Sequence, residues 1–88
     1  WQPENISADV FPNPANGLAT IQLNAKSNEH YKISLTDLLG KNRFEEEVRT
    51  DDEGFSQLMI DVSLYAKGIY YVSISNNADK QFLKLLVH

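Results

Sequence analysis

The chain has 88 residues, no cysteine and a formal net charge of −4, from 8 basic and 12 acidic side chains. This length is sufficient for one small domain, and the absence of cysteine excludes a disulfide scaffold, a thiol nucleophile and a thiolate metal site. The acidic balance argues against nucleic-acid binding, because no basic stripe is present to neutralise phosphates. No apolar run is long enough for direct insertion into a membrane.

Segments that alternate apolar and polar residues are separated by clusters of Gly, Asn, Asp and Pro, which favour turns. Period-two alternation with β-branched and aromatic residues is typical of half-buried strands. The pattern predicts strands at residues 7–11, 18–24, 30–37, 42–49, 56–62, 69–75 and 81–87. The residues predicted to be buried between two sheets are Ile21, Leu23, Ile33, Leu35, Leu58, Ile60, Tyr70, Val72 and Ile74.

Seven short strands without a helical segment predict an all-β fold, a seven-stranded antiparallel immunoglobulin-like β-sandwich. An alternative is a small α+β domain in which residues 81–87 form a helix, since that segment is apolar on both faces apart from Lys84. The segment 42–49 contains three consecutive carboxylates at residues 45–47. Charges on a strand block edge-to-edge pairing, so we expect a solvated edge of the sandwich there.

Several residues near the turns are predicted to shape the backbone. Gly40 and Gly68 are expected to adopt positive φ or to lie where two backbones approach closely. Asp37 is expected to accept hydrogen bonds from nearby backbone N–H groups, and Tyr70 to bury its ring while its hydroxyl group bonds to a loop. Gly54 lies in an acidic loop that we expect to be loose. Substitution of Gly68 by valine should therefore destabilise the domain more than the same substitution of Gly54.

The sequence offers little for catalysis or metal binding. His30 and His88 are the two histidines, and neither lies near a nucleophile motif. Residues 51–53 are consecutive acids but lack the spacing of a calcium-binding loop, which favours a solvated turn. Residues 45–47 have no enclosed apolar site that would raise the pKa of one carboxyl group for acid–base catalysis. We therefore predict that the domain is not an enzyme and holds no metal or cofactor.

Two other functions are compatible with such a sandwich. Tyr65 and Tyr71 could form a small stacking platform for sugars, which would make the chain a carbohydrate-binding or adhesive β-sandwich module appended to a secreted hydrolase. The third reading is an inert spacer between catalytic modules.

Four segments occur together in a familiar order. They are residues 10–17 (VFPNPANG), 35–41 (LTDLLGK), 60–64 with 67–72 (IDVSL and KGIYYV), and 82–87 (FLKLLV). The set resembles the C-terminal sorting domain, type A, of the type IX (Por) secretion system of Bacteroidetes. The resemblance covers residues 9–88, and residues 1–8 are then expected to be a linker from an upstream cargo domain. The sorting-motif residues that it implies are Pro12, Asn13, Pro14, Asp37, Gly40, Lys41, Gly68, Tyr70, Lys84, Leu85 and Val87.

The resemblance implies a secretion signal that is covalently fused to a cargo protein and is itself a substrate. The cargo would pass through the periplasm, be recognised by the outer-membrane type IX translocation machinery, and end secreted or at the cell surface. A sortase would usually remove the domain and join the cargo to surface lipopolysaccharide. The chain departs from the family pattern in carrying one lysine, Lys84, in its terminal strand, where several members have two or more. We expect residues 81–87 to form an edge strand, supported by residues 68–74, that the machinery reads.

Overall fold

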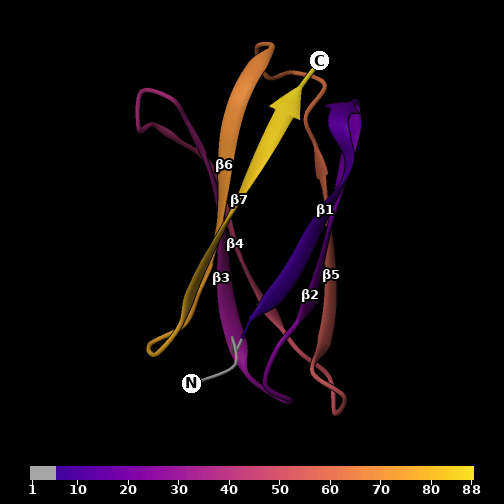
Figure 1. Cartoon of the computed structure of the whole chain (residues 1–88), viewed down its shortest axis with the longest axis vertical. Coiled ribbons are helices and arrows are strands. Elements are labelled where there is room, and N and C mark those ends of the chain that lie inside the picture. The colour runs from indigo at the N-terminus through magenta and orange to yellow at the C-terminus, as the bar shows by residue number, and fades with distance from the viewer. Residues whose placement is uncertain (1–5) are drawn as a thin grey trace.

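The computed structural model describes residues 6–88, which form seven strands and no helix (Figure 1). The strands are β1 (Ser7–Asn16), β2 (Leu18–Asn24), β3 (His30–Asp37), β4 (Asn42–Arg49), β5 (Phe55–Asp61), β6 (Gly68–Ser75) and β7 (Lys80–Val87). Every predicted strand is present, and the α+β alternative is wrong because residues 81–87 belong to a strand. Within the described range no helix is long and apolar enough to cross a membrane.

The first strand is longer than the sequence predicted. The prolines at residues 12 and 14 indicate a turn after Phe11, yet β1 continues to Asn16. Its pairing with β2 is regular over Ser7–Phe11 and then shifts before the final pair, Asn16 with Leu18. The prolines therefore mark an irregularity within the strand and not its end, as is usual where a strand lacks backbone N–H groups.

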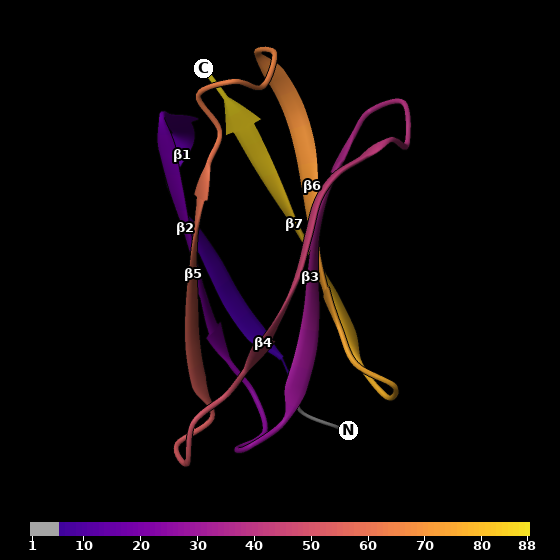
Figure 2. The ribbon, with the colours of Figure 1, turned by 180° about the vertical axis from the view of Figure 1, so that it is seen from behind.

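The strands pack as a sandwich of two layers, which Figure 2 shows from behind. One layer contains β1, β2 and β5, and the other contains β4, β3, β6 and β7. The end of β1 also pairs with β7 and so joins the two layers. The resulting strand order is β4-β3-β6-β7-β1-β2-β5. All neighbouring strands are antiparallel except β1 and β7, which are parallel where Ala15 meets Val87. The expectation that residues 81–87 form an edge strand is wrong for the second half of β7, which meets β1 at Ala15 and Val87, whereas no described strand pairs with the first half on that side.

The core lies between the two layers and follows the predicted alternation. Of the nine residues predicted to be buried, Leu58 is the exception, since it is only partly buried against the core. It lies on β5, which ends the strand order, so no further strand covers its side. The core also includes Ile6, at 2% exposure. Ile6 belongs to the segment expected to be a linker, whose residues 1–5 lie outside the described part of the chain.

The strands β4 and β5 lie at the two ends of the strand order. The edge position of β4 was expected, because that segment contains three carboxylates. Glu45, Glu46 and Glu47 are all exposed on β4. The ion pair between Lys32 and Glu45, with 3.4 Å between Nζ and Oε2, is itself half exposed. Such pairs contribute roughly 0–1 kcal/mol, so the charges on β4 determine solubility and pairing more than stability.

The glycines confirm one prediction and overturn another. Gly40 and Gly68 have φ of 83° and 150°, as expected. Gly54, however, is buried at a φ of 82°, and a Cβ atom added there would overlap the carbonyl oxygen of Ala25. An added Cβ at Gly68 would meet nothing. The loose loop expected around Gly54 is therefore wrong, because Gly54 packs against another backbone, and we expect the reverse order for the two valine substitutions.

Candidate functional site

Residues from three distant segments meet in one row at the end of the larger layer. In the pairing of β3 with β6, Asp37 lies opposite Tyr70. In the pairing of β6 with β7, Tyr70 lies opposite Leu85, and Gly68 lies opposite Val87. Leu85 and Val87 are buried, with 0% and 4% exposure. We call Asp37, Tyr70 and Leu85 the terminal row, because it crosses the sheet three residues before the C-terminal His88.

A side-chain contact holds the other side of β7. The Nδ2 group of Asn13 donates a hydrogen bond to the Lys84 carbonyl, at 2.9 Å, and its Oδ1 accepts one from the Leu86 N–H, at 3.0 Å. Two residues further on, the His88 N–H donates to the Ala15 carbonyl at 2.8 Å. The amide of Asn13 thus pairs with β7 as the backbone of a neighbouring strand would. We call the two bonds that Asn13 makes to β7 the Asn13 clamp.

The prolines explain why a side chain performs this task. Pro12 and Pro14 have no N–H to donate and fix φ near −65°, so the backbone on both sides of Asn13 cannot complete a ladder. Residues before proline are also driven towards extended conformations, which suits Asn13. Pro12, Asn13 and Pro14 are all exposed, whereas Ala15 is buried beside Val87. The sequence identified Asn13 as a residue of the sorting motif and did not predict this long-range contact.

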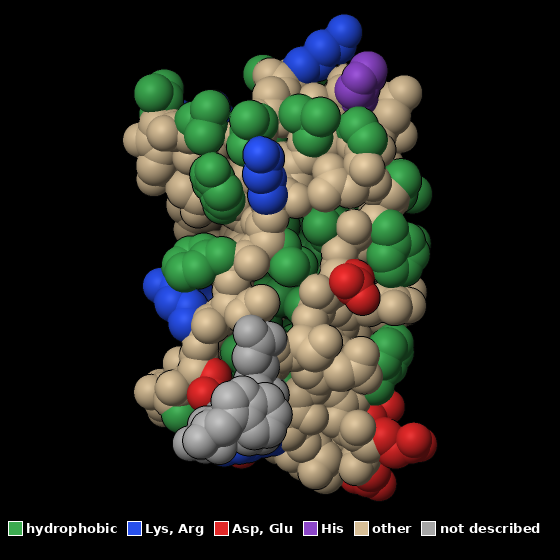
Figure 3. Space-filling view, viewed as in Figure 1, with side chains coloured by type: hydrophobic (Ala, Val, Ile, Leu, Met, Phe, Trp, Pro, Cys, Tyr) green, Lys and Arg blue, Asp and Glu red, His purple; other side chains and the backbone are tan. Residues whose placement is uncertain are grey.

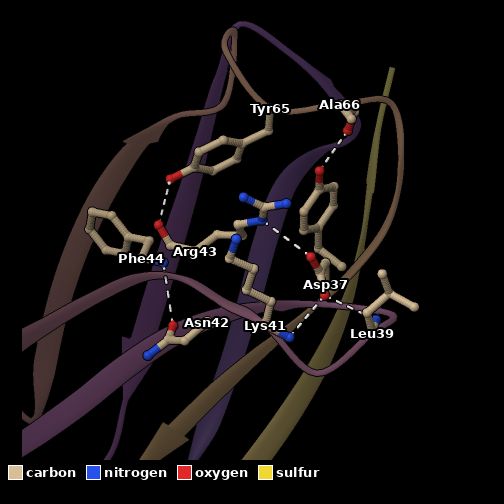
Figure 4. A network of polar contacts seen from close by, with 9 residues as sticks. Asp37, Leu39, Lys41, Asn42, Arg43, Phe44, Tyr65 and Ala66 are labelled. Carbon is tan, nitrogen blue, oxygen red and sulfur yellow. Dashed lines mark hydrogen bonds and ion pairs between the residues drawn. The ribbon is translucent and has the colours of Figure 1, made fainter.

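Asp37 organises the hairpin between β3 and β4, as Figure 4 shows. Its Oδ1 accepts hydrogen bonds from the N–H groups of Leu39 and Lys41, each at 2.9 Å. Its Oδ2 accepts a hydrogen bond from the Nε–H group of Arg43 at 3.2 Å, which also makes the two side chains an ion pair. The predicted role of Asp37 is confirmed, and Gly40 supplies the positive φ that this turn needs. The Lys41 N–H above all, together with Leu39 and Arg43, holds the pKa of the Asp37 carboxyl group below its usual range, although partial desolvation opposes them.

Two tyrosines lie beside this hairpin. Tyr70 is buried at 4% exposure and donates a hydrogen bond from its hydroxyl group to the Ala66 carbonyl at 2.7 Å, as predicted. The ring of Tyr65 packs against that of Tyr70 with 5.9 Å between centroids. The Tyr65 hydroxyl group donates to the Arg43 carbonyl at 3.3 Å (Figure 4). The parts that Arg43 and Tyr65 play were not predicted, since an exposed arginine and a tyrosine near a turn carry no local signal.

Other candidates from the sequence do not assemble into a site. Tyr71 alternates with the inward-facing Tyr70 along β6, so it lies on the opposite face from Tyr65, and the two do not form a stacking platform. The Oδ1 atom of Asp51 accepts hydrogen bonds from the Glu53 and Phe55 N–H groups, both at 2.9 Å, which is a turn contact. No group of metal-binding side chains occurs among residues 6–88.

The outer face of β7 carries alternating basic and apolar side chains. Lys80, Phe82, Lys84 and Leu86 all point outward, and Phe82 is 59% exposed. The Lys80 Nζ lies 5.1 Å from the centre of the Phe82 ring, a cation–π contact. Tyr71, on the neighbouring strand β6, is 41% exposed. Both aromatic residues line a hollow of about 570 Å³.

Comparison with known proteins identifies one family and one fold. The family model described as "Secretion system C-terminal sorting domain" matches residues 9–88. No curated protein matches the chain. Among solved structures, the crystal structure of dimeric latent PorU from Porphyromonas gingivalis is similar, with a TM-score of 0.70 and 17% identity. The match covers 99% of this chain but only 10% of that PorU chain. At this identity the likeness shows the fold.

Proposed function

Because this chain belongs to the family of secretion system C-terminal sorting domains, we propose that it carries an upstream cargo protein across the outer membrane through the type IX secretion system. The domain is a sorting signal, and its family is not itself catalytic. One observation carries the proposal further. Motif residues from separate segments converge on the second half of β7, through the terminal row and the Asn13 clamp.

The surface that the machinery reads is the outer face of β7. The backbone edge of the second half of β7 is not available for binding the machinery. The Asn13 clamp and the bond from His88 to Ala15 already occupy backbone groups on that edge. The side chains of Phe82 and Leu86, at 59% and 37% exposure, are available instead, with lysines between them. Exposed apolar groups beside charged ones are common in protein contacts.

The domain acts as a substrate of its partners. The cargo of a sorting domain is secreted or reaches the cell surface, and the domain interacts with the secretion machinery. In finer terms, we infer that the cargo waits in the periplasm, that the outer-membrane translocation machinery binds the domain, and that a sortase then removes it. The carboxylates of Asp37, whose side chain is 15% exposed, and of the exposed Asp61 are both engaged in turn contacts.

The proposal is tested with a reporter protein fused upstream of the 88-residue chain in a bacterium that has the type IX system. The Phe82→Ser substitution should retain the fold but leave more reporter in the periplasm, since it removes an outward-facing ring. The matched control is Leu18→Ser, because Leu18 is 52% exposed on the outer face of the other layer. If both fusions reach the cell surface as well as the unchanged one, the outer face of β7 is not the signal. If the unchanged fusion stays in the periplasm, the domain does not sort.

A further inference from the structure

The two strands that end the strand order differ in how they are protected. On β4, three glutamates and two arginines occur within eight residues. On β5, by contrast, no charged side chain occurs between Phe55 and Ile60. Natural sheets usually protect a free edge with charge, proline or a bulge, because an unprotected edge adds strands from other molecules. The pairing of β5 with β2 is also regular along its whole length. The neutral, regular edge of β5 is therefore the exception that needs an explanation.

The backbone of β5 presents free groups on this edge. Two bonds fix which residues face β2: the Gly54 carbonyl accepts from the Ala25 N–H, and the Val62 N–H donates to the Gly17 carbonyl. Because backbone groups alternate along a strand, Gln57 and Met59 direct their N–H and C=O groups away from β2. No other described strand pairs with β5 on that side. Phe55, by contrast, uses its backbone groups in contacts with Asp51.

Apolar side chains lie beside this edge. Leu58 on β5 and both Phe44 and Val48 on β4 are partly buried against the core. Glu46 lies between the last two on the same face of β4, opposite the buried Ile33, yet it is exposed. The core itself stays buried, with Ile33 and Ile60 at 1% and 2% exposure, but Leu58, Phe44 and Val48 are left only partly covered between the two end strands. A strand added to β5 would cover these side chains further, and would bring one of its own inward side chains towards the Glu46 carboxylate.

Carboxylates also flank the edge at both ends. The hairpin that leads into β5 contains three exposed acids at residues 51–53, and Figure 3 shows acidic side chains gathered at that end of the molecule. At the other end, the Ser63 N–H and hydroxyl group bond to the Asp61 Oδ1 atom at 3.0 and 2.6 Å. These bonds hold the pKa of Asp61 below its usual range. The edge is thus a neutral run between two negative ends.

We propose that the free edge of β5 binds an extended segment of a partner protein, whose uncharged, β-prone centre pairs with Gln57 and Met59 and whose two ends carry lysine or arginine. Addition of a strand to a sheet edge gives affinity through main-chain hydrogen bonds and specificity through side chains. The carboxylates that flank β5 would attract the basic ends of such a partner and would repel the same carboxylates of a second copy of this chain. In an antiparallel pair of β5 strands, Asp61 of each copy would approach the acidic hairpin of the other.

The experiment measures peptide binding to the purified 88-residue chain by fluorescence anisotropy. The probe is a labelled peptide with alternating Thr and Val residues and a pair of Lys at each end, and its matched control has Glu in place of Lys. We expect the Lys peptide to bind at least about tenfold more tightly than the Glu peptide, and its affinity to fall as salt is added. Backbone amide signals of Gln57 and Met59 should shift in NMR spectra.

Two proline variants locate the contact. Gln57→Pro removes an N–H that β5 does not use within the sheet, so it should retain the fold and abolish peptide binding. Glu47→Pro is the matched control, because Glu47 is an exposed residue on β4, the other end strand. The proposal is overturned if neither peptide binds, if both bind equally, or if binding survives Gln57→Pro. Self-association of the chain that Gln57→Pro abolishes would instead make a second copy the occupant, and would also overturn it. These measurements use no secretion step, so they are independent of the sorting proposal.

Discussion

The side-chain amide of Asn13 donates a hydrogen bond to the carbonyl of Lys84, 71 residues further along the chain. With the bond from Leu86 to the same side chain, this contact replaces the backbone pairing that Pro12 and Pro14 cannot make. It fixes the last part of β7 against β1, at the point where the two layers of the sandwich are joined. The motif of two prolines and an asparagine therefore acts on the far end of the sequence.

We predict that Asn13→Ala loosens the end of β7 without unfolding the domain. The loss of two hydrogen bonds at an exposed site should lower the free energy of unfolding by about 1–3 kcal/mol, measured by urea denaturation. Hydrogen exchange of the Leu86 and His88 amides should become faster, because both lie at the released end. Asn13→Asp is the stricter comparison, since it keeps the acceptor for Leu86 but cannot donate to Lys84. Unchanged exchange at Leu86 in both variants would mean that the clamp does not hold β7.

A second prediction concerns the core. Ile33 is 1% exposed between the layers, so Ile33→Ala should lower the free energy of unfolding by about 2–5 kcal/mol. That is a large part of the roughly 5–15 kcal/mol that stabilises a typical domain. The control is Lys32→Ala, at the exposed neighbouring position, which should change stability by less than about 1 kcal/mol. Similar denaturation midpoints for the two variants would contradict the assignment of the inner face of β3.

A third prediction reverses the order expected for two glycines. Gly54→Val should lower the melting temperature more than Gly68→Val, because both residues have positive φ but only Gly54 also meets another backbone, at Ala25. Strained backbone conformations cost roughly 1–3 kcal/mol each, and the clash adds to that cost only at Gly54. Differential scanning calorimetry of the two variants decides the matter. An equal or larger effect at Gly68 would show that Ala25 can move away.

These results show which parts of the structure are encoded locally. Strand positions could be predicted because alternation and turn residues act over a few neighbours, and the Asp37 turn could be predicted for the same reason. The continuation of β1, the place of β7 within the sheet and the Asn13 clamp depend on pairing between segments at opposite ends of the chain. The packing of Gly54 against Ala25 is likewise a long-range contact. The edge role expected for β7 was wrong for its second half, because position in the sequence does not determine position in a sheet.

A fourth prediction is a loss of stability in acid that depends on Asp37. Its pKa is lower in the folded chain than its ordinary value of 3.8, so the unfolded chain takes up the proton first as the pH falls. The stabilisation is therefore present above the unfolded pKa and is lost as the pH falls through the folded one. Asp37→Asn should lower the melting temperature at neutral pH, and the difference should shrink as the pH falls through 3.8 and below. Asp9→Asn controls for the lost charge, and an undiminished difference at low pH would contradict the prediction.

The last prediction concerns removal of the chain's end, which is the obvious way to test a C-terminal signal. Deletion of residues 83–88 removes Leu85 and Val87, which are 0% and 4% exposed in the core, and it removes the partners of Asn13. We therefore expect the truncated domain to lose its cooperative thermal transition. A cargo that stays in the periplasm after this deletion would then report unfolding as much as the loss of a signal. Deletion of His88 alone removes one exposed residue and its bond to Ala15, so that variant should still unfold cooperatively at a slightly lower temperature. A cooperative transition for the longer deletion, measured by circular dichroism, would show that β7 is dispensable for folding, and export after truncation would then report on the signal alone.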